Sequence, residues 1–142
     1  DPFCVTRHKD DFIRLLKGYV NMVFCNQEEA FTLLDTKITQ KAVETMSDWT
    51  ETVALTIGSY GALISHQRET FYIDPLPVRV EDTTGAGDAF AAGFLYGMTQ
   101  DYSPLDSGRI GSALASGVIG QTGPRYLGNA RNLIKEKLGL IL

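Results

Sequence analysis

The most informative segment of this sequence is Glu81-Asp82-Thr83-Thr84-Gly85-Ala86-Gly87-Asp88-Ala89-Phe90. Gly85 and Gly87 allow the backbone to adopt conformations barred to other residues and to approach a ligand closely. The apolar run that follows predicts a helix, whose first N–H groups have no acceptor within the helix and form a site for an anion. Asp88 stands at that site, where its negative charge would repel a bound phosphate.

The placement of Asp88 therefore needs a chemical reason. A general base that removes a proton from a hydroxyl attacking phosphorus supplies one. The alternative is a glycine turn in which Asp88 caps the N-terminus of the helix, a common use of aspartate. The length of the pattern around Asp88 favours the general base.

Residues 82–90 resemble the C-terminal signature of the ribokinase-like (PfkB) carbohydrate and nucleoside kinases. Phe90–Gly97 and Gly123-Pro124-Arg125 are most similar to the adenosine-kinase-like sugar kinases of bacteria. The resemblance implies an α/β fold, a ribokinase-like layered sheet with flanking helices. Residues 1–142 would be its C-terminal nucleotide-binding and catalytic portion, because the N-terminal substrate and lid portion of the family is not recognisable in this sequence.

The resemblance also implies ATP-dependent phosphoryl transfer to a hydroxyl of a sugar or of an adenosine-like nucleoside. Asp88 would be the general base, and the N–H groups of Gly85, Ala86, Gly87 and Asp88 would form an anion hole for the transferred group. Mg²⁺ would bridge the nucleotide phosphates. Two other classes stay open: a nucleotide-binding fragment without autonomous kinase activity, and a structural or partner-binding remnant.

A second motif follows the apolar residues Phe24 and Cys25. Asn26 and Glu29 match the family's Asn-x-x-Glu pattern. The resemblance implies that Glu29 acts through water on Mg²⁺, which prefers oxygen ligands and keeps several waters, while Asn26 orients a phosphate or a water. The alternative is a capping box in which Asn26 caps a helix and Glu29 returns the hydrogen bond. Both interpretations can hold together, because the same cap can present the carboxylate.

The run from Leu55 to Ala62 resembles the family segment in which a strand ends beneath the nucleotide. Thr56 and Gly58 would line the phosphate or ribose, and Gly61 would allow the turn into the next strand. The alternative is a plain tight turn, for which glycines are equally suited.

Residues 116–125 resemble the family's late helix and loop. By this resemblance Ser112 would face the adenine edge, and backbone carbonyls would hold a monovalent cation such as K⁺. The alternative for the helix is simple packing. The candidate cation ligands are the carbonyl oxygens of Asp82, Thr84, Val118 and Gly123.

Composition argues against nucleic-acid binding and against a membrane-spanning segment. The chain has 142 residues, a net charge of −4 and a pI near 5.1, without the Lys/Arg clustering of a nucleic-acid-binding surface. No apolar run is long enough to span a membrane, and Cys4 and Cys25 predict buried free thiols in a reducing cytoplasm. The expected partners are a small sugar or nucleoside and, through exposed apolar surface, a second copy or the missing N-terminal portion.

Hydrophobic periodicity predicts alternating strands and helices, which are typical of α/β layers around a mainly parallel sheet. Residues 3–5 form a short strand-like run. The other strands are expected at 20–25 and 53–57, with a hairpin formed by 62–65 and 70–73. Helices are expected at 10–19, 27–34, 38–46, 88–98, 105–119 and 131–138.

Overall fold

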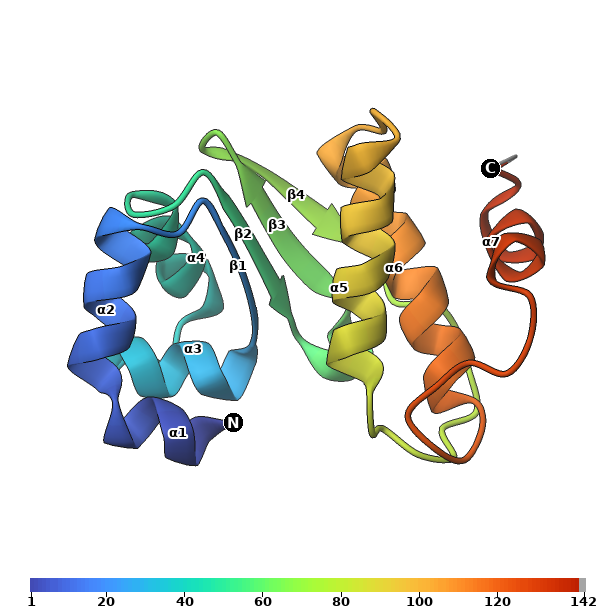
Figure 1. Ribbon diagram of the computed structural model, residues 1–142, viewed down its shortest axis with the longest axis horizontal. Coiled ribbons are helices and arrows are strands. Elements are labelled where there is room, and N and C mark those ends of the chain that lie inside the picture. Colours follow the sequence, from blue (N-terminus) through green and yellow to red (C-terminus); the bar gives the residue numbers. More distant parts are fainter. Residues whose placement is uncertain (141–142) are drawn as a thin grey trace. The chain divides into compact units, whose positions relative to one another are not determined.

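The computed structural model describes residues 1–140 and divides the chain into two units (Figure 1). Unit 1 comprises Asp1–Gly58 and Ala62–Tyr72, and unit 2 comprises Ser59–Gly61 and the chain from Ile73 onward. The domain prediction ran to residue 142, so its last two residues lie outside the described part.

Unit 1 is an α/β layer in which α3 and α4 pack against the strands (Figure 1). The N-terminal helices α1 and α2 pack against α3. Its helices are α1 (Pro2–Arg7), α2 (Lys9–Gly18), α3 (Gln27–Leu34) and α4 (Thr39–Ser47). Its strands are β1 (Met22–Asn26), β2 (Thr52–Thr56), β3 (Ala62–His66) and β4 (Glu69–Ile73), of which the last residue, Ile73, belongs to unit 2. A short 3₁₀ turn, η1 (Gly58–Tyr60), precedes β3 and begins with the last residue of the first segment of unit 1.

The sheet is mixed and has the order β1-β2-β3-β4. β1 and β2 run parallel, with Asn26 opposite Thr56, whereas β2 and β3 run antiparallel. The prediction of a mainly parallel sheet was therefore wrong. The physical reason is that β2 is joined to β3 by residues 57–61 alone, a connection too short for the crossover that parallel strands need. β3 is joined to β4 by the predicted two-residue turn, Gln67-Arg68. Both turn residues have positive φ, as the tightest hairpin turns require.

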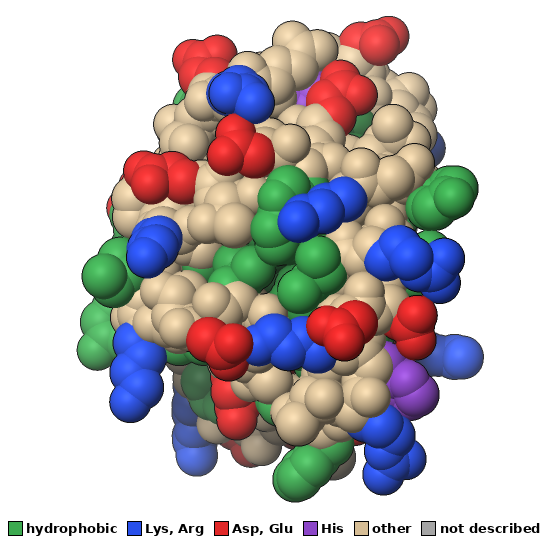
Figure 2. Space-filling model, turned by 90° about the vertical axis from the view of Figure 1, so that its left-hand side faces the viewer, with side chains coloured by type: hydrophobic (Ala, Val, Ile, Leu, Met, Phe, Trp, Pro, Cys, Tyr) green, Lys and Arg blue, Asp and Glu red, His purple; other side chains and the backbone are tan. Residues whose placement is uncertain are grey.

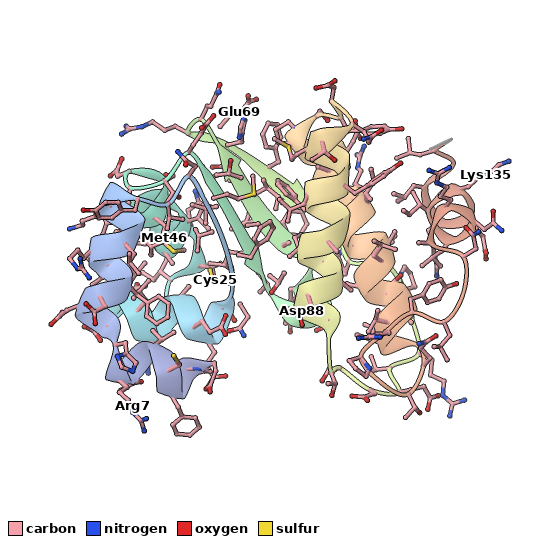
Figure 3. All side chains as sticks on the ribbon, viewed as in Figure 1. Arg7, Cys25, Met46, Glu69, Asp88 and Lys135 are labelled. Carbon is pink, nitrogen blue, oxygen red and sulfur yellow. The ribbon has the colours of Figure 1, made fainter. Side chains whose placement is uncertain are left out.

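The core of unit 1 forms where alternate residues of β2 face the helices. Val53 and Leu55 are fully buried in one cluster with Ala42, Val43 and Met46 of α4. Figure 3 shows Met46 lying between the helices and strands of this unit. Burial of side chains of this size contributes about 1.5–3 kcal/mol each, so this cluster fixes α4 against the sheet.

The start of the chain departs from prediction, because residues 3–5 lie in helix α1 and not in a strand. Asp1 caps the helix by accepting a hydrogen bond from the Phe3 N–H at 2.9 Å, and Pro2 occupies the first turn, where its missing N–H costs nothing. Val5 is the buried residue of this helix. Cys4 is exposed and Cys25 is half-buried, so the expectation of a buried thiol was wrong for Cys4 and holds only in part for Cys25.

Large hydrophobic side chains are exposed on unit 1, as expected. Phe3 is 84% and Tyr19 76% exposed, and Leu15 and Ile38 are also exposed. Figure 2 shows hydrophobic side chains gathered in the middle of the helical face, with Lys, Arg, Asp and Glu around them. Among residues 1–140, no helix is both long enough and apolar enough to cross a membrane.

Unit 2 is built on a close pair of helices, α5 (Ala86–Thr99) and α6 (Pro104–Ile119), with α7 (Ala130–Leu138) against α6 (Figure 1). The helices α5 and α6 meet through residues with little or no side chain. A Cβ added at Gly93 would lie 2.7 Å from the Cα of Gly111, and one at Gly97 would lie 2.6 Å from the Ser107 Oγ. The predicted helices and the hairpin are confirmed to within two residues at each end.

Gly93→Ala should destabilise unit 2, because the new methyl group would be forced into the backbone of α6. We expect a loss of about 1–3 kcal/mol in the free energy of unfolding, measured by urea denaturation with circular dichroism. The matched control is Gly18→Ala at the end of α2, where a Cβ meets nothing within 4 Å. That change should be neutral or stabilising by up to about 1 kcal/mol. Equal effects of the two substitutions would contradict backbone-level packing of α5 on α6.

The two cysteines should differ sharply in reactivity. Burial and, secondarily, the nearby Glu29 raise the pKa of the Cys25 thiol to about 12, and this residue lies on β1 (Figure 3). At pH 8.5 a thiol with this pKa has roughly a thousandfold less thiolate than an ordinary one. Timed alkylation read by mass spectrometry should therefore modify exposed Cys4 first. Labelling of Cys25 in a Cys4→Ser variant at the rate of Cys4 in the unsubstituted chain would contradict the burial of Cys25.

Candidate functional site

The start of α5 is a glycine turn, and it leaves Asp88 exposed. Gly85 is the N-cap residue, with φ +80° and ψ 0°, and no side chain caps this helix. The interpretation of Asp88 as the N-cap was therefore wrong. Asp88 lies three positions further on, in the first helical turn (Figure 3). Among the described residues its carboxylate has no hydrogen-bond or ion-pair partner.

The N–H groups of this turn differ in whether they are free. The Ala86 N–H donates to the Thr83 carbonyl oxygen at 3.2 Å. Within residues 1–140, the N–H groups of Gly85, Gly87 and Asp88 have no acceptor. Three donors at a helix N-terminus, where the helix dipole is positive, are a favourable arrangement for an anion.

The Asp82 carboxylate organises the turn that precedes the helix. Its Oδ1 accepts the Thr84 N–H at 2.8 Å, and its Oδ2 accepts the Gly123 N–H at 3.1 Å. Hydrogen bonds from the Thr84 N–H and hydroxyl, followed by the Gly123 N–H, hold the pKa of the Asp82 carboxyl below its ordinary value. The ionised carboxylate is thus the form that the turn binds.

Two further contacts join this turn to the end of α6. The Ile119 carbonyl oxygen accepts the N–H groups of Glu81 at 2.8 Å and of Asp82 at 3.4 Å. A Cβ added at Gly85 would lie only 2.5 Å from the Pro124 carbonyl oxygen, so these two residues are in close backbone contact. The 81–85 and 119–124 segments therefore form one connected loop pair.

The predicted cation ligands all lie on this loop pair. Asp82 and Thr84 belong to one segment, and Val118 and Gly123 belong to the other or to the helix end before it. The Val118 carbonyl oxygen already accepts the N–H groups of Gly120 and of Gln121, the latter at 3.3 Å, so it would bind a cation only by giving up one of them. Ser112 lies further back on α6 and is half-buried.

In unit 1 three predicted site residues meet at the carboxyl ends of the parallel strands. Asn26 ends β1 and lies opposite Thr56, which ends β2. Asn26 also caps α3: its Oδ1 accepts the Glu29 N–H and the Glu29 Oε2 accepts the Asn26 N–H, both at 2.9 Å. The capping box is therefore present. In open α/β sheets, this edge of the parallel strands is where ligands bind.

Glu29 is held in a fixed orientation by these bonds. Its other oxygen, Oε1, pairs with the α-ammonium group of Asp1. No group of three or more His, Cys, Asp or Glu side chains in the described part of the chain is arranged to hold a metal ion.

The two glycines after β2 have different reasons for being glycine. Gly61 has φ +84°, and a Cβ there would lie 2.0 Å from the Ile73 carbonyl oxygen, so the turn itself requires glycine. Gly58 has φ +58° but faces open space. The contacts of Gly61 are accounted for without a ligand, and nucleotide contact by either residue stays a prediction.

Sequence reasoning missed the side-chain role of Asp82 and the contact made by Pro124. It also missed Gln121, whose amide Nε2 donates to the Arg125 carbonyl oxygen while its Oε1 accepts the Leu127 N–H. The closely spaced glycines around these positions were the available signal, but the partners of Asp82 and Pro124 across the loop pair, Gly123 and Gly85, lie about 40 residues away in the sequence.

A family model places the chain among known proteins. Residues 2–130 match the pfkB family carbohydrate kinase model. The chain belongs to the pfkB family of carbohydrate kinases. The predicted membership of the ribokinase-like kinases is confirmed, and so is the α/β fold with flanking helices.

Individual relatives agree with the family. A protein named as an uncharacterized sugar kinase of Archaeoglobus fulgidus is 33% identical over 115 residues, which are 81% of this chain and 46% of the relative. A probable sugar kinase of Rhizobium etli has a crystal structure that matches with a TM-score of 0.92 and 40% identity, over 96% of this chain and 42% of that one. The adenosine kinase of Sinorhizobium meliloti matches with a TM-score of 0.91 and 35% identity, over the same shares. The chain thus spans less than half the length of these pfkB-family relatives.

Two substitutions test whether the capping box or the negative charge of Glu29 supports α3 in this pfkB-family chain. Glu29→Gln keeps an acceptor for the Asn26 N–H, so the free energy of unfolding should change by less than about 0.5 kcal/mol. Glu29→Ala removes the acceptor and should cost about 1 kcal/mol, measured by urea denaturation. An equal loss in both variants would show that the charge of Glu29, and not its place in the capping box, supports α3.

Proposed function

We propose that this chain carries the nucleotide-binding and catalytic portion of an ATP-dependent kinase that phosphorylates a hydroxyl of a sugar or nucleoside. The observation that carries the proposal is the start of α5. There an exposed, unpartnered carboxylate, Asp88, follows directly on free N–H donors at Gly85 and Gly87. Membership of the pfkB family and the sugar and adenosine kinases among its relatives support the same reaction.

In the proposed reaction, the acceptor hydroxyl forms a bond to the γ-phosphorus of ATP as the bond to the bridging oxygen breaks and ADP leaves. Asp88 takes the hydroxyl proton as general base. The N–H groups of Gly85, Gly87 and Asp88 stabilise the charge on the transferred phosphoryl group. Ala86 would add a fourth donor only by giving up its bond to Thr83.

Unit 1 would contribute at the nucleotide phosphates. Glu29 is oriented by its capping box and offers a carboxylate of the kind that acts on Mg²⁺ through water. Asn26 and Thr56 lie side by side at the strand ends and would contact phosphate or water, with Gly58 next in the chain. Mg²⁺ would neutralise charge on the phosphates during transfer.

In unit 2 the carbonyl oxygens of Asp82, Thr84, Val118 and Gly123 are proposed as ligands of K⁺, and Ser112 as a contact of the adenine. Hard carbonyl oxygens on two linked segments suit a monovalent cation, which would stabilise the loop pair without touching the acceptor. We further propose an adenosine-like nucleoside or a sugar as acceptor, because the two closely similar structures are an adenosine kinase and a probable sugar kinase. We also propose that the reaction takes place in the cytoplasm, where ATP is available.

A second candidate function is nucleotide binding without autonomous catalysis. It is favoured by one observation: the chain spans 42% of the length of its structural relatives, so residues that grip the acceptor need not lie within it. Activity would then require a second copy or the portion of the family fold that this sequence lacks.

Asp88→Asn should abolish acceptor-dependent ATP turnover, lowering kcat by about 10²–10⁴, while the Kd for ATP changes less than about threefold. Turnover is measured on a panel of nucleosides and sugars, and binding by calorimetry. The control is Asp101→Asn, an exposed aspartate of unit 2 at φ +60°, a conformation that asparagine tolerates.

The outcomes separate the two candidate functions. Turnover lost in Asp88→Asn and kept in Asp101→Asn supports the kinase. ATP binding with no turnover in any variant supports the nucleotide-binding function. Full turnover in Asp88→Asn would overturn the role of Asp88, and absence of ATP binding would overturn both functions.

A further inference from the structure

The Asp82 carboxylate links two segments of unit 2 that lie 41 residues apart in the sequence. One oxygen accepts an N–H of its own turn, from Thr84 at 2.8 Å, and the other accepts the Gly123 N–H at 3.1 Å. Each bond uses a different oxygen. A carboxylate is therefore the only side chain of this length that can make both, since an amide presents one acceptor and one donor.

The linked segments also press together at Gly85. The turn made by Asp82 and Thr84 leads straight into Gly85, whose φ of +80° starts α5. Pro124 lies directly against Gly85, at a distance that leaves no room for a Cβ. The residue next to Pro124 is Gly123, which the Asp82 carboxylate holds. The hydrogen bond from Gly123 thus fixes the turn at Asp82, and the contact with Pro124 fixes it at Gly85.

The 121–125 loop is itself held by side-chain hydrogen bonds, so it can support the 82–85 turn. The Gln121 side chain bonds the Arg125 carbonyl oxygen and the Leu127 N–H, closing the loop across its base. The Ile119 carbonyl oxygen, at the end of α6, binds the N–H groups of Glu81 and Asp82. The turn is thus held against a loop that is fixed to a long helix.

We propose that Asp82 is a positioning residue that acts through Gly85. By fixing the 82–85 turn on the 121–125 loop, its carboxylate sets the direction of the free N–H groups of Gly85, Gly87 and Asp88. The proposal concerns the side chain of Asp82 and is separate from any use of its carbonyl oxygen by a cation. Its catalytic part rests on the proposed phosphoryl transfer, and its structural part does not.

The structural part is tested by amide hydrogen exchange, measured by NMR on the whole chain. Asp82→Asn keeps one acceptor and should speed exchange at one of the two amides of Thr84 and Gly123 by about tenfold or more, while Asp82→Ala should do so at both. The matched control is Glu81→Gln, which removes the same charge one residue earlier and leaves the bond from the Glu81 N–H to Ile119 intact. Unchanged exchange at both amides in Asp82→Ala would overturn the proposal.

The positioning part is tested by ATP titration followed at the Gly87 and Asp88 amides. Asp82→Asn should weaken ATP binding by about fivefold or more and should lower kcat by at least about tenfold, with the KM for the acceptor within about twofold. The midpoint of thermal unfolding should stay within about 2 °C, because the turn is largely exposed. Glu81→Gln should match the unsubstituted chain in every readout.

Faster exchange combined with unchanged ATP binding in Asp82→Asn would overturn the positioning role, since the bonds would then serve only the loop. If the unsubstituted chain binds ATP but transfers no phosphate, the proposed kinase activity fails while the exchange and titration results still decide the role of Asp82. In Asp82→Asn, kcat should fall but keep the same pH dependence as in the unsubstituted chain, because the proposed base is Asp88. That result would support a positioning role for Asp82.

Discussion

The close approach of Gly85 to Pro124 is the constraint on which the candidate site depends. A residue with any side chain would meet the Pro124 carbonyl oxygen, and its φ of +80° would be strained as well. Because Gly85 takes this conformation, α5 begins without a side-chain cap, and within residues 1–140 the N–H groups of Gly85, Gly87 and Asp88 stay free. Asp88 then falls in the first turn with its carboxylate exposed. The anion site and the proposed base thus follow from one backbone contact.

Capping and chemistry are not competing explanations in this chain. Asn26 and Glu29 satisfy each other's N–H groups at the start of α3, which is a sufficient structural reason for both residues. The same bonds hold the Glu29 carboxylate against Asn26, which ends β1 opposite Thr56 at the end of β2. At Asp88 the two interpretations did compete. The N-cap residue of α5 is Gly85 and not Asp88, so capping does not explain Asp88.

Much of the fold could be predicted from sequence because its elements have strong local signals. The periodic helices and the hairpin around Gln67-Arg68 lie close to their predicted bounds. The error at residues 3–5 arose because the cap by Asp1 and the fit of Pro2 in the first turn outweigh a short apolar run. The strand directions went wrong because alternation of helices and strands says little about how a hairpin closes the sheet.

The candidate site was predictable only in part, for a different reason. Motif residues such as Asn26, Gly85 and Asp88 are local, and sequence reasoning found them. The bond from Gly123 to Asp82 and the contact of Pro124 with Gly85 are tertiary contacts. The local sequence around each of these residues does not indicate its partner. Which turn N–H groups are free depends on these contacts and on the bond from Ala86 to Thr83.

The small residues between α5 and α6 have a mechanical consequence. At Gly93 and Gly97 the helices touch through backbone and Cβ atoms, so there are few rotamers at these points to absorb a displacement. The second half of α5 and the first half of α6 should therefore move together as one body. This block gives the first turn of α5, which carries Asp88, a stiffer base than a pair of helices joined by long side chains would give it.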